Sequence, residues 1–145
     1  MTSGTSRYNP GMDPRQIATF SGSLSRCLAD PGFLTRFYEL FLGSSPEIAG
    51  KFKNTDFDKQ KRALSSSLYV LVMAMEGGAP ALAYLERIAQ QHSREGIDIR
   101  PELYDTWLRC LIQAVQEHDP QFTEEIEQLW RETMQVGIDF MRERH

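Results

Sequence analysis

The sequence predicts a single all-α domain, and three observations lead to this prediction. Apolar residues recur every three to four positions along nearly the whole chain, which is the spacing of one helix face. Proline directly follows Asp or Ser at several places, as it does at the start of many helices. The alternation of β-branched residues that is typical of strands is absent. We therefore expect about seven helices around one core, because 145 residues is the length of one domain.

The first half of the chain contains a tail and four predicted helices. Residues 1–12 are rich in Ser, Thr and Gly and are expected to form a flexible N-terminal tail, which leaves residues 13–145 for the domain. A capping oxygen followed by Pro at the first helical position marks three helix starts. These starts are Asp13-Pro14, Asp30-Pro31 and Ser45-Pro46, and Thr55 is the next predicted cap, ahead of Asp56 and Asp58. The third of these helices is expected to be short and to end near Phe52.

Three further helices are predicted in the second half. Glycine ends a helix readily, and proline begins one or prevents its continuation. The boundaries predicted on this basis are Gly77-Gly78, Pro80, Gly96, Pro101 and Asp119-Pro120. The last helix carries an apolar stripe that extends to Phe140. No internal repeat of fixed period is visible, and the helices differ too much in length for a regular four-helix bundle.

The composition excludes several classes of function. A net charge of −4 provides no positive footprint for a nucleic acid, and the longest apolar run is far too short to span a bilayer. The N-terminal residues lack the apolar core of a signal peptide. Two isolated cysteines, Cys27 and Cys110, do not form a disulfide framework. We therefore expect a cytoplasmic protein with no nucleic-acid partner and no membrane partner.

The three histidines, His92, His118 and His145, lack the close spacing of a zinc site. His118 is interpreted as a solvated loop residue near a helix break. His92 follows Ile88 by one turn on the apolar face of its predicted helix. One interpretation of His92 is a buried histidine that is hydrogen-bonded to a carbonyl group. The other is a single axial ligand of a haem iron, because one neutral imidazole is enough to hold haem.

Two polar side chains lie among apolar residues in the first half of the chain. Gln60 is one turn before Leu64 on the predicted core face of its helix, where an amide needs a hydrogen-bond partner. Tyr38 follows Phe37 in an aromatic-rich helix, and a buried hydroxyl also needs a partner. A bound diatomic ligand would supply a hydrogen-bond partner to both side chains. The alternative is that Gln60 is exposed beside its basic neighbours and that Tyr38 lies at the rim.

The order of these residues resembles the bacterial single-domain haemoglobins, which belong to the globin family. It is similar to Vitreoscilla-type haemoglobin and to the globin domain of flavohaemoglobins. The resemblance extends over about residues 17–140. The segments that carry it are Phe37-Tyr38-Glu39-Leu40-Phe41, Ser45-Pro46-Glu47, Phe52, Gln60 with Leu64, and His92 in the pattern His-x-x-x-Gly.

The resemblance implies a globin fold around a pocket for haem b (iron protoporphyrin IX). His92 would be the proximal iron ligand, and Phe52 would press against the porphyrin face. Tyr38 and Gln60 would form the distal hydrogen-bonding pair, with Leu64 as their apolar neighbour. The residues that would line the pocket on the proximal side are Ile88, Tyr104 and Leu108.

The implied function is reversible binding of dioxygen, and of CO and NO, at a five-coordinate iron. It would serve oxygen binding, transport or scavenging, in a monomer or a homodimer. One alternative is a nitric oxide dioxygenase that works with a separate reductase, and another is a haemless globin-like interaction or sensor module. An enzymatic role is not favoured, and no residue is assigned as catalytic.

One departure from the resembled family bears on whether the protein has an enzymatic role. The glutamate that supports the proximal histidine in flavohaemoglobins falls at or near His145, and Glu143 is out of register. Without that anionic partner a histidine is a softer donor, which puts peroxidase-like or dioxygenase chemistry in doubt.

Overall fold

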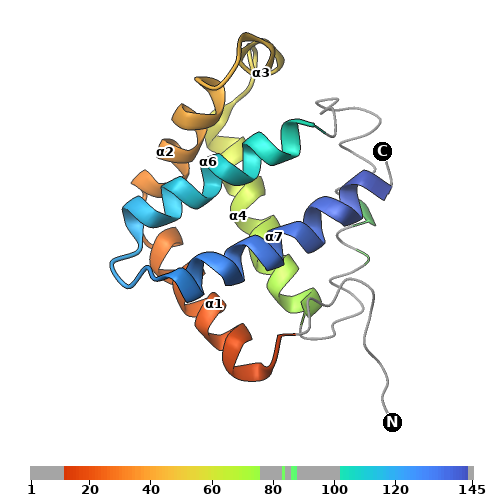
Figure 1. The fold of residues 1–145 in the computed structure, drawn as a ribbon. Helices are drawn as coiled ribbons and strands as arrows, with labels where there is room; N and C mark the ends of the chain where they lie inside the picture. The colour runs from red at the N-terminus through yellow and green to blue at the C-terminus, as the bar shows by residue number, and fades with distance from the viewer. Residues whose placement is uncertain (1–11, 76–82, 84–85, 88–101, 144–145) are drawn as a thin grey trace.

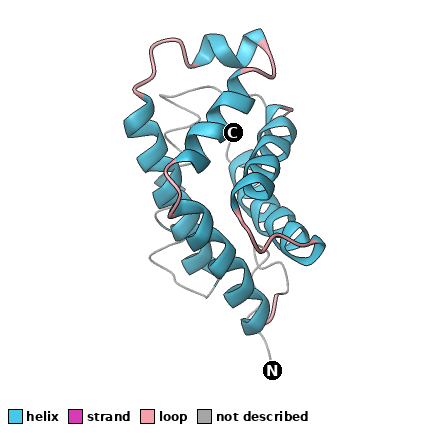
Figure 2. Cartoon of the chain, turned by 90° about the vertical axis from the view of Figure 1, so that its left-hand side faces the viewer, coloured by secondary structure: helices cyan, strands magenta, loops and turns pink. Residues whose placement is uncertain are grey.

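The six helices of the described chain confirm the all-α prediction. The computed structural model describes residues 12–75, 83, 86–87 and 102–143. Within these residues no strand is present, and short loops join helices that follow one another directly (Figure 2). The helices are α1 (Pro14–Leu28), α2 (Gly32–Leu42), α3 (Pro46–Lys51), α4 (Phe57–Met75), α6 (Leu103–His118) and α7 (Glu124–Glu143). The helix predicted between Pro80 and Gly96 falls mostly outside the described residues.

The helices pack across one another rather than in parallel. Helix α6 packs most extensively on α2, and α7 packs on both α6 and α1 (Figure 1). Helix α4 packs on α1, and α3 is a short helix at the end of α2. This irregular arrangement agrees with the expectation that the chain is not a regular bundle. No helix in the described part of the chain is long and apolar enough to cross a membrane.

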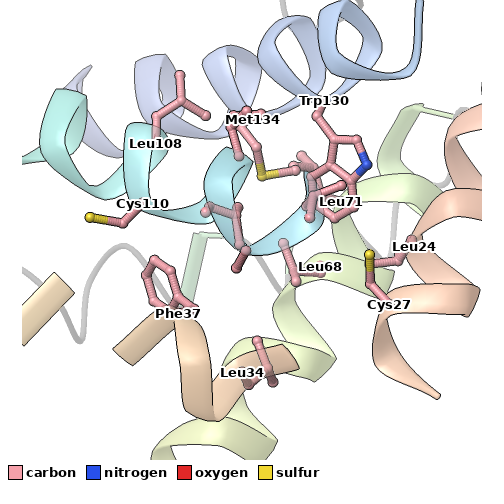
Figure 3. Close-up of a cluster of buried hydrophobic side chains, with 14 of the residues drawn as sticks. Leu24, Cys27, Leu34, Phe37, Leu68, Leu71, Leu108, Cys110, Trp130 and Met134 are labelled. Atoms are coloured by element: carbon pink, nitrogen blue, oxygen red, sulfur yellow. The ribbon is translucent and has the colours of Figure 1, made fainter. Parts of the chain in front are cut away.

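The centre of the core is built around Trp130 of α7, which is fully buried. Phe20 of α1 meets its ring edge-on, with ring centroids 4.8 Å apart, and Phe33 of α2 lies at 6.4 Å. Such tilted contacts suit the charge distribution of aromatic rings. Leu71 of α4 and Met134 of α7 lie beside the indole (Figure 3). Four helices therefore share one apolar centre.

Two of the predicted helix starts are confirmed by their hydrogen bonds. The Asp13 carboxylate accepts from the backbone N–H of Gln16 at 2.8 Å, and the Gln16 side chain accepts from the backbone N–H of Asp13 at 3.0 Å. This reciprocal pair is a capping box. The Ser45 hydroxyl accepts from the backbone N–H of Ile48 at 3.1 Å. Met12, the last residue of the expected tail, is buried in the core, while residues 1–11 lie outside the described residues.

The predicted cap of the fourth helix is wrong by one residue. Helix α4 begins at Phe57 rather than at Asp56, so the residue in the capping position is Asp56 and not Thr55. The Asp56 carboxylate accepts from the backbone N–H groups of Asp58 at 3.1 Å and Lys59 at 3.3 Å. Both Thr and Asp are good capping residues, so composition alone does not choose between neighbours.

The interpretation of His118 as a solvated loop residue is also wrong. His118 is the last residue of α6 and is partly buried. Its Nδ1 lies 2.8 Å from the carbonyl oxygen of Ala114, and its ring meets Phe33 at 5.9 Å. The helix continues to the residue before Asp119, and its last turn buries the imidazole against α2.

A buried carboxylate, Asp119, joins the corner after α6 to α1. Its side chain is fully buried and accepts from the Ser23 hydroxyl at 2.6 Å and from Nε of Arg26 at 2.7 Å. The backbone N–H of Gln121 adds a third hydrogen bond at 2.9 Å. Ser23 in turn accepts from the indole N–H of Trp130 at 2.9 Å. Burial opposes ionisation, but these hydrogen bonds outweigh it and hold the pKa of Asp119 below its ordinary value of 3.8.

We expect Asp119→Asn to lower the free energy of unfolding by about 2–3 kcal/mol, because it removes the charge that Arg26 faces in a buried setting. Urea unfolding followed by circular dichroism measures this difference. Because the folded-state pKa is lowered, the stabilisation is present above pH 4 and is lost as the pH falls through that pKa. The difference between wild type and variant should therefore shrink in acid.

Asp139→Asn is the matched control for this prediction, because Asp139 lies on the exposed face of α7. It should change the stability by no more than about 0.5 kcal/mol. Equal effects of the two substitutions, or a difference that does not depend on pH, would show that the Asp119 network does not stabilise the fold.

Candidate functional site

The candidate site begins with Tyr38, which α2 directs into the molecule. The side chain is 6% exposed, so the alternative that Tyr38 lies at the rim is not what the structure shows. Helix α2 has an apolar inner face that includes Phe37 and Phe41, and Tyr38 lies next to it. The hydroxyl group is thereby carried into a mostly apolar region, where a polar group needs a partner.

Aromatic rings surround Tyr38 on the side of the α3–α4 corner. Phe57, the first residue of α4, lies 5.4 Å from the Tyr38 ring, and Phe52 lies at 6.1 Å. Phe52 and Phe57 stack on each other with centroids 6.0 Å apart. Phe52 also meets Phe41 at 6.0 Å. The rings hold the corner at residues 53–56 against α2 and fix the orientation of the phenol.

The side-chain amide of Gln60 lies near the Tyr38 hydroxyl and favours its ionised form. Gln60 is half-buried on α4, so it is not the fully exposed residue of the alternative interpretation. Burial raises the pKa of Tyr38 to about 12, and the nearby Gln60 amide opposes this rise only in part. The hydroxyl therefore keeps its proton at neutral pH. An amide N–H that donates to the phenolic oxygen leaves the O–H proton for another acceptor.

An apolar wall continues along α4 from this polar pair. Leu64 follows Gln60 by one turn and packs against the core, and Leu68 follows by another turn and is 2% exposed. Residues spaced by four positions lie above one another on a helix. Gln60 and Leu64 therefore lie on one face of α4, and Tyr38 lies near Gln60 and beside Phe52.

On α6 the other two described candidates lie one turn apart. Leu108 is buried, and Tyr104 is half-buried. Burial raises the pKa of Tyr104, and the positive charge of Arg142 from α7 lowers it in part. Arg142 also lies near Asp105, with Nη2 and Oδ1 3.6 Å apart. The cation that acts on Tyr104 is thus paired with a carboxylate of α6.

Comparison with known proteins decides the family. The family model described as Globin matches residues 35–141. This chain belongs to the globin family. Its structure is similar to the crystal structure of a Pseudomonas aeruginosa protein, with 40% sequence identity and a TM-score of 0.82. The match covers 89% of this chain and 97% of the other.

That Pseudomonas protein is itself described as structurally highly homologous to a human haemoglobin. A search of the curated proteins gives no match. The family match and the structural match confirm the predicted family and the predicted fold.

Not every predicted site residue of this globin is placed. His92 and Ile88 lie outside the described residues, so their roles stay predictions. Phe57 was missed, although the sequence contains a signal for it. It precedes Gln60 by three positions and Leu64 by seven, and residues at this spacing share one helix face.

The remaining chemistry-bearing residues of the globin are structural where they are described. Cys27 and Cys110 are buried free thiols. Burial raises the pKa of Cys27 to about 12, so it is not a thiolate nucleophile at neutral pH. This confirms the interpretation of Cys27 as a small core residue. Within the described ranges, no group of three His, Cys, Asp or Glu side chains could hold a metal ion.

We expect the Tyr38 hydroxyl to stay protonated up to about pH 11 in the folded protein, since its pKa is about 12. Ultraviolet difference titration of wild type and Tyr38→Phe measures this, and the two curves should coincide below that pH. Gln60→Leu should raise the pKa of Tyr38 further, because it removes a hydrogen bond that favours the phenolate. The burial of Tyr38 would be contradicted if the wild-type curve showed a tyrosine that ionises near pH 10 and the curve of Tyr38→Phe lacked it.

Proposed function

We propose that this globin holds haem b through His92 and reversibly binds dioxygen and other diatomic gases beside Tyr38. The observation that carries the proposal is the buried Tyr38 side chain, whose hydroxyl lies near the Gln60 amide and next to an apolar wall. The family match supports it, because it makes haem the expected cofactor. The proposed setting is a cytoplasmic carrier or scavenger, as a monomer or a homodimer.

The described residues fit a haem group. Phe52 would supply a buried aromatic ring for one porphyrin face, and Leu64 and Leu108 would supply apolar surface. Tyr104 is half-buried on α6 one turn before Leu108. Most of the affinity for haem comes from burying its apolar ring, and one imidazole completes the attachment. His92, with Ile88 one turn before it in the sequence, would provide that attachment.

Ferrous haem supplies an open coordination position for a diatomic gas when it is bound. The Tyr38 hydroxyl would donate a hydrogen bond to a polar ligand at that position. Gln60 would hold the phenol in place by donating to its oxygen. A hydrogen bond to a charged group contributes roughly 1.5–3 kcal/mol, or about tenfold to a hundredfold in affinity. Carbon monoxide is less polar than bound dioxygen and would gain less from the same donor.

The apolar side chains around Tyr38 have a second role in the proposal. Phe52 and Phe57 cover the phenol from one side, and Leu64 extends the apolar surface along α4. Water that entered here would compete for the Tyr38 proton and would bring protons to the ligand. Excluding water keeps the single hydrogen bond strong, since a hydrogen bond gains strength in a low local dielectric.

We expect His92→Ala to lose haem or to leave the iron without its nitrogen donor. Absorption spectra of the ferric, ferrous and gas-bound forms measure this, with circular dichroism to check folding. His118→Ala is the matched control, because His118 contacts Ala114 and Phe33 in the core and should leave the spectrum unchanged. Unaltered iron coordination in His92→Ala would overturn the proposed attachment. A wild-type protein that takes up no haem would support the haemless interaction module instead.

We expect Tyr38→Phe to raise the dioxygen dissociation rate by about tenfold or more, because it removes one hydrogen bond to a partially charged ligand. Flash photolysis or stopped-flow displacement measures this rate. Tyr69→Phe removes an exposed hydroxyl on the outer side of α4 and should leave the rate unchanged. If Tyr38→Phe left the rate unchanged as well, the distal role of Tyr38 would be wrong. Steady nitric oxide consumption with a supplied reductase would favour the dioxygenase alternative.

A further inference from the structure

Helix α4 has a second ordered face, opposite to the one that carries Gln60. Five exposed positions follow one another at spacings of three and four residues: Lys59, Arg62, Ser66, Tyr69 and Met73. This spacing forms one continuous stripe on a helix. At about 100° per residue, the centre of the stripe lies opposite the row formed by Phe57, Gln60, Leu64 and Leu68. We call these five residues the outer stripe of α4.

The C-terminal half of the outer stripe is unusually apolar for a surface. Tyr69 is 45% exposed and Met73 is 48% exposed. They are the two large hydrophobic side chains found exposed in the described part of the chain. Adjacent exposed apolar side chains that are flanked by polar ones are typical of a protein contact site.

The N-terminal half of the outer stripe is positively charged, in a chain whose net charge is negative. Residues 51–62 contain five cations and two carboxylates, whereas the whole chain has a net charge of −4. Asp56 is used as the cap of α4, and Asp58 lies 3.8 Å from Lys61. Among the described residues, no ion-pair partner meets Lys53, Lys59 or Arg62.

The α3–α4 corner adds to this positive region. Phe52 and Phe57 stack with centroids 6.0 Å apart, so the chain turns tightly between them. Lys53 in the loop that precedes α4 is exposed, and so is Lys59 in the first turn of α4. The result is a cationic end and an apolar end on one continuous surface.

A partner for this surface must offer negative charge and a small apolar contact. A symmetric dimer formed through the outer stripe does not fit, because the stripe contains no carboxylate to pair with Lys59 and Arg62 of the other copy. An anionic membrane fits less well than a protein, since the apolar part consists of two side chains and cannot insert deeply. A small contact area with complementary charge is typical of weak electron-transfer complexes.

We infer that the outer stripe of α4, with Lys53 of the adjacent corner, is a docking surface for a small acidic electron-transfer protein. The electron-transfer class rests on the proposed function, because a haem group is what such a partner would serve. The charges would guide the partner to the surface, and Tyr69 and Met73 would provide the desolvated contact. Docking there would place the partner on the helix that also carries Gln60.

Titration of the isotope-labelled protein with a bacterial flavodoxin, an acidic flavoprotein, tests this inference by NMR. The expected result is a set of shift changes confined to the outer stripe and residues 51–53, with affinity that falls as salt is raised. Lys59→Glu with Arg62→Glu should weaken binding by at least about tenfold. Tyr69→Ala with Met73→Ala should weaken it several-fold without removing its salt dependence.

Arg109→Glu with Arg131→Glu is the matched control, since it makes the same change of net charge at exposed positions of α6 and α7. It should weaken binding far less than the Lys59 and Arg62 pair. Equal effects of the two pairs, or shift changes elsewhere, would overturn the inference. So would binding to vesicles of phosphatidylcholine and phosphatidylglycerol in place of flavodoxin, or self-association through Tyr69 and Met73.

The docking inference and the proposed function can fail separately. Haem uptake and the spectrum of the His92 variant test the proposed function, and neither involves the outer stripe. A protein with a normal haem spectrum that does not bind flavodoxin would overturn the docking surface alone. A protein that binds flavodoxin at α4 but takes up no haem would overturn the proposed function, and with it the electron-transfer role, but not the docking surface itself.

Discussion

The position of Asp119 is the constraint on which the helical arrangement depends. This single carboxylate meets Ser23 and Arg26 of α1 at 2.6 and 2.7 Å and the backbone of Gln121 at 2.9 Å. It therefore ties the corner between α6 and α7 to the first helix of the chain. Because its partners satisfy it fully, it can be buried without the cost of an unpaired charge. A carboxylate with this set of partners permits one corner geometry only.

The candidate site depends on that corner through packing. Helix α6 is held at its C-terminal end by the corner, and along its length it packs on α2. Helix α2 in turn carries Tyr38, and the Phe37 ring lies 5.8 Å from Trp107 of α6. Three contacts thus position the phenol. The corner holds α6, α6 packs on α2, and the rings of Phe52 and Phe57 contact the phenol directly. The packing of α6 on α2 and the ring contacts join residues that are far apart in sequence, which is why the site exists only in the folded chain.

Local chemistry predicted the helices well and the partners of individual side chains less well. Asp13 and Ser45 cap their helices as expected, since capping depends on neighbours within three residues. The same reasoning placed the cap of α4 at Thr55 and placed His118 in a loop. Both errors concern the exact ends of helices, which depend on how the helix packs against the core. Burial of Tyr38 and its contact with Gln60 could be proposed from the resemblance. Placing the two side chains near each other needed α2 and α4 in position, because Tyr38 and Gln60 are 22 positions apart in the sequence.

The fully satisfied Asp119 network could not be inferred from the sequence at all. Ser23 and Asp119 are separated by 96 positions, and neither stands out from other surface-type residues in composition. Phe57 is the opposite case, because its spacing to Gln60 and Leu64 identifies its face in advance. Periodicity thus reveals which side of a helix is buried, whereas long-range polar pairs require the three-dimensional arrangement.

The two opposite faces of α4 have an evolutionary consequence. Substitutions on one face leave the other in place, so the proposed ligand chemistry and the proposed surface recognition could diverge independently along this helix. A change of length is different, because inserting one residue after Gln60 would rotate everything beyond it by about 100°. Leu64 would then leave the pocket side while Tyr69 turned toward the interior. Drift in this part of the globin should therefore proceed by replacement of side chains and not by insertion or deletion.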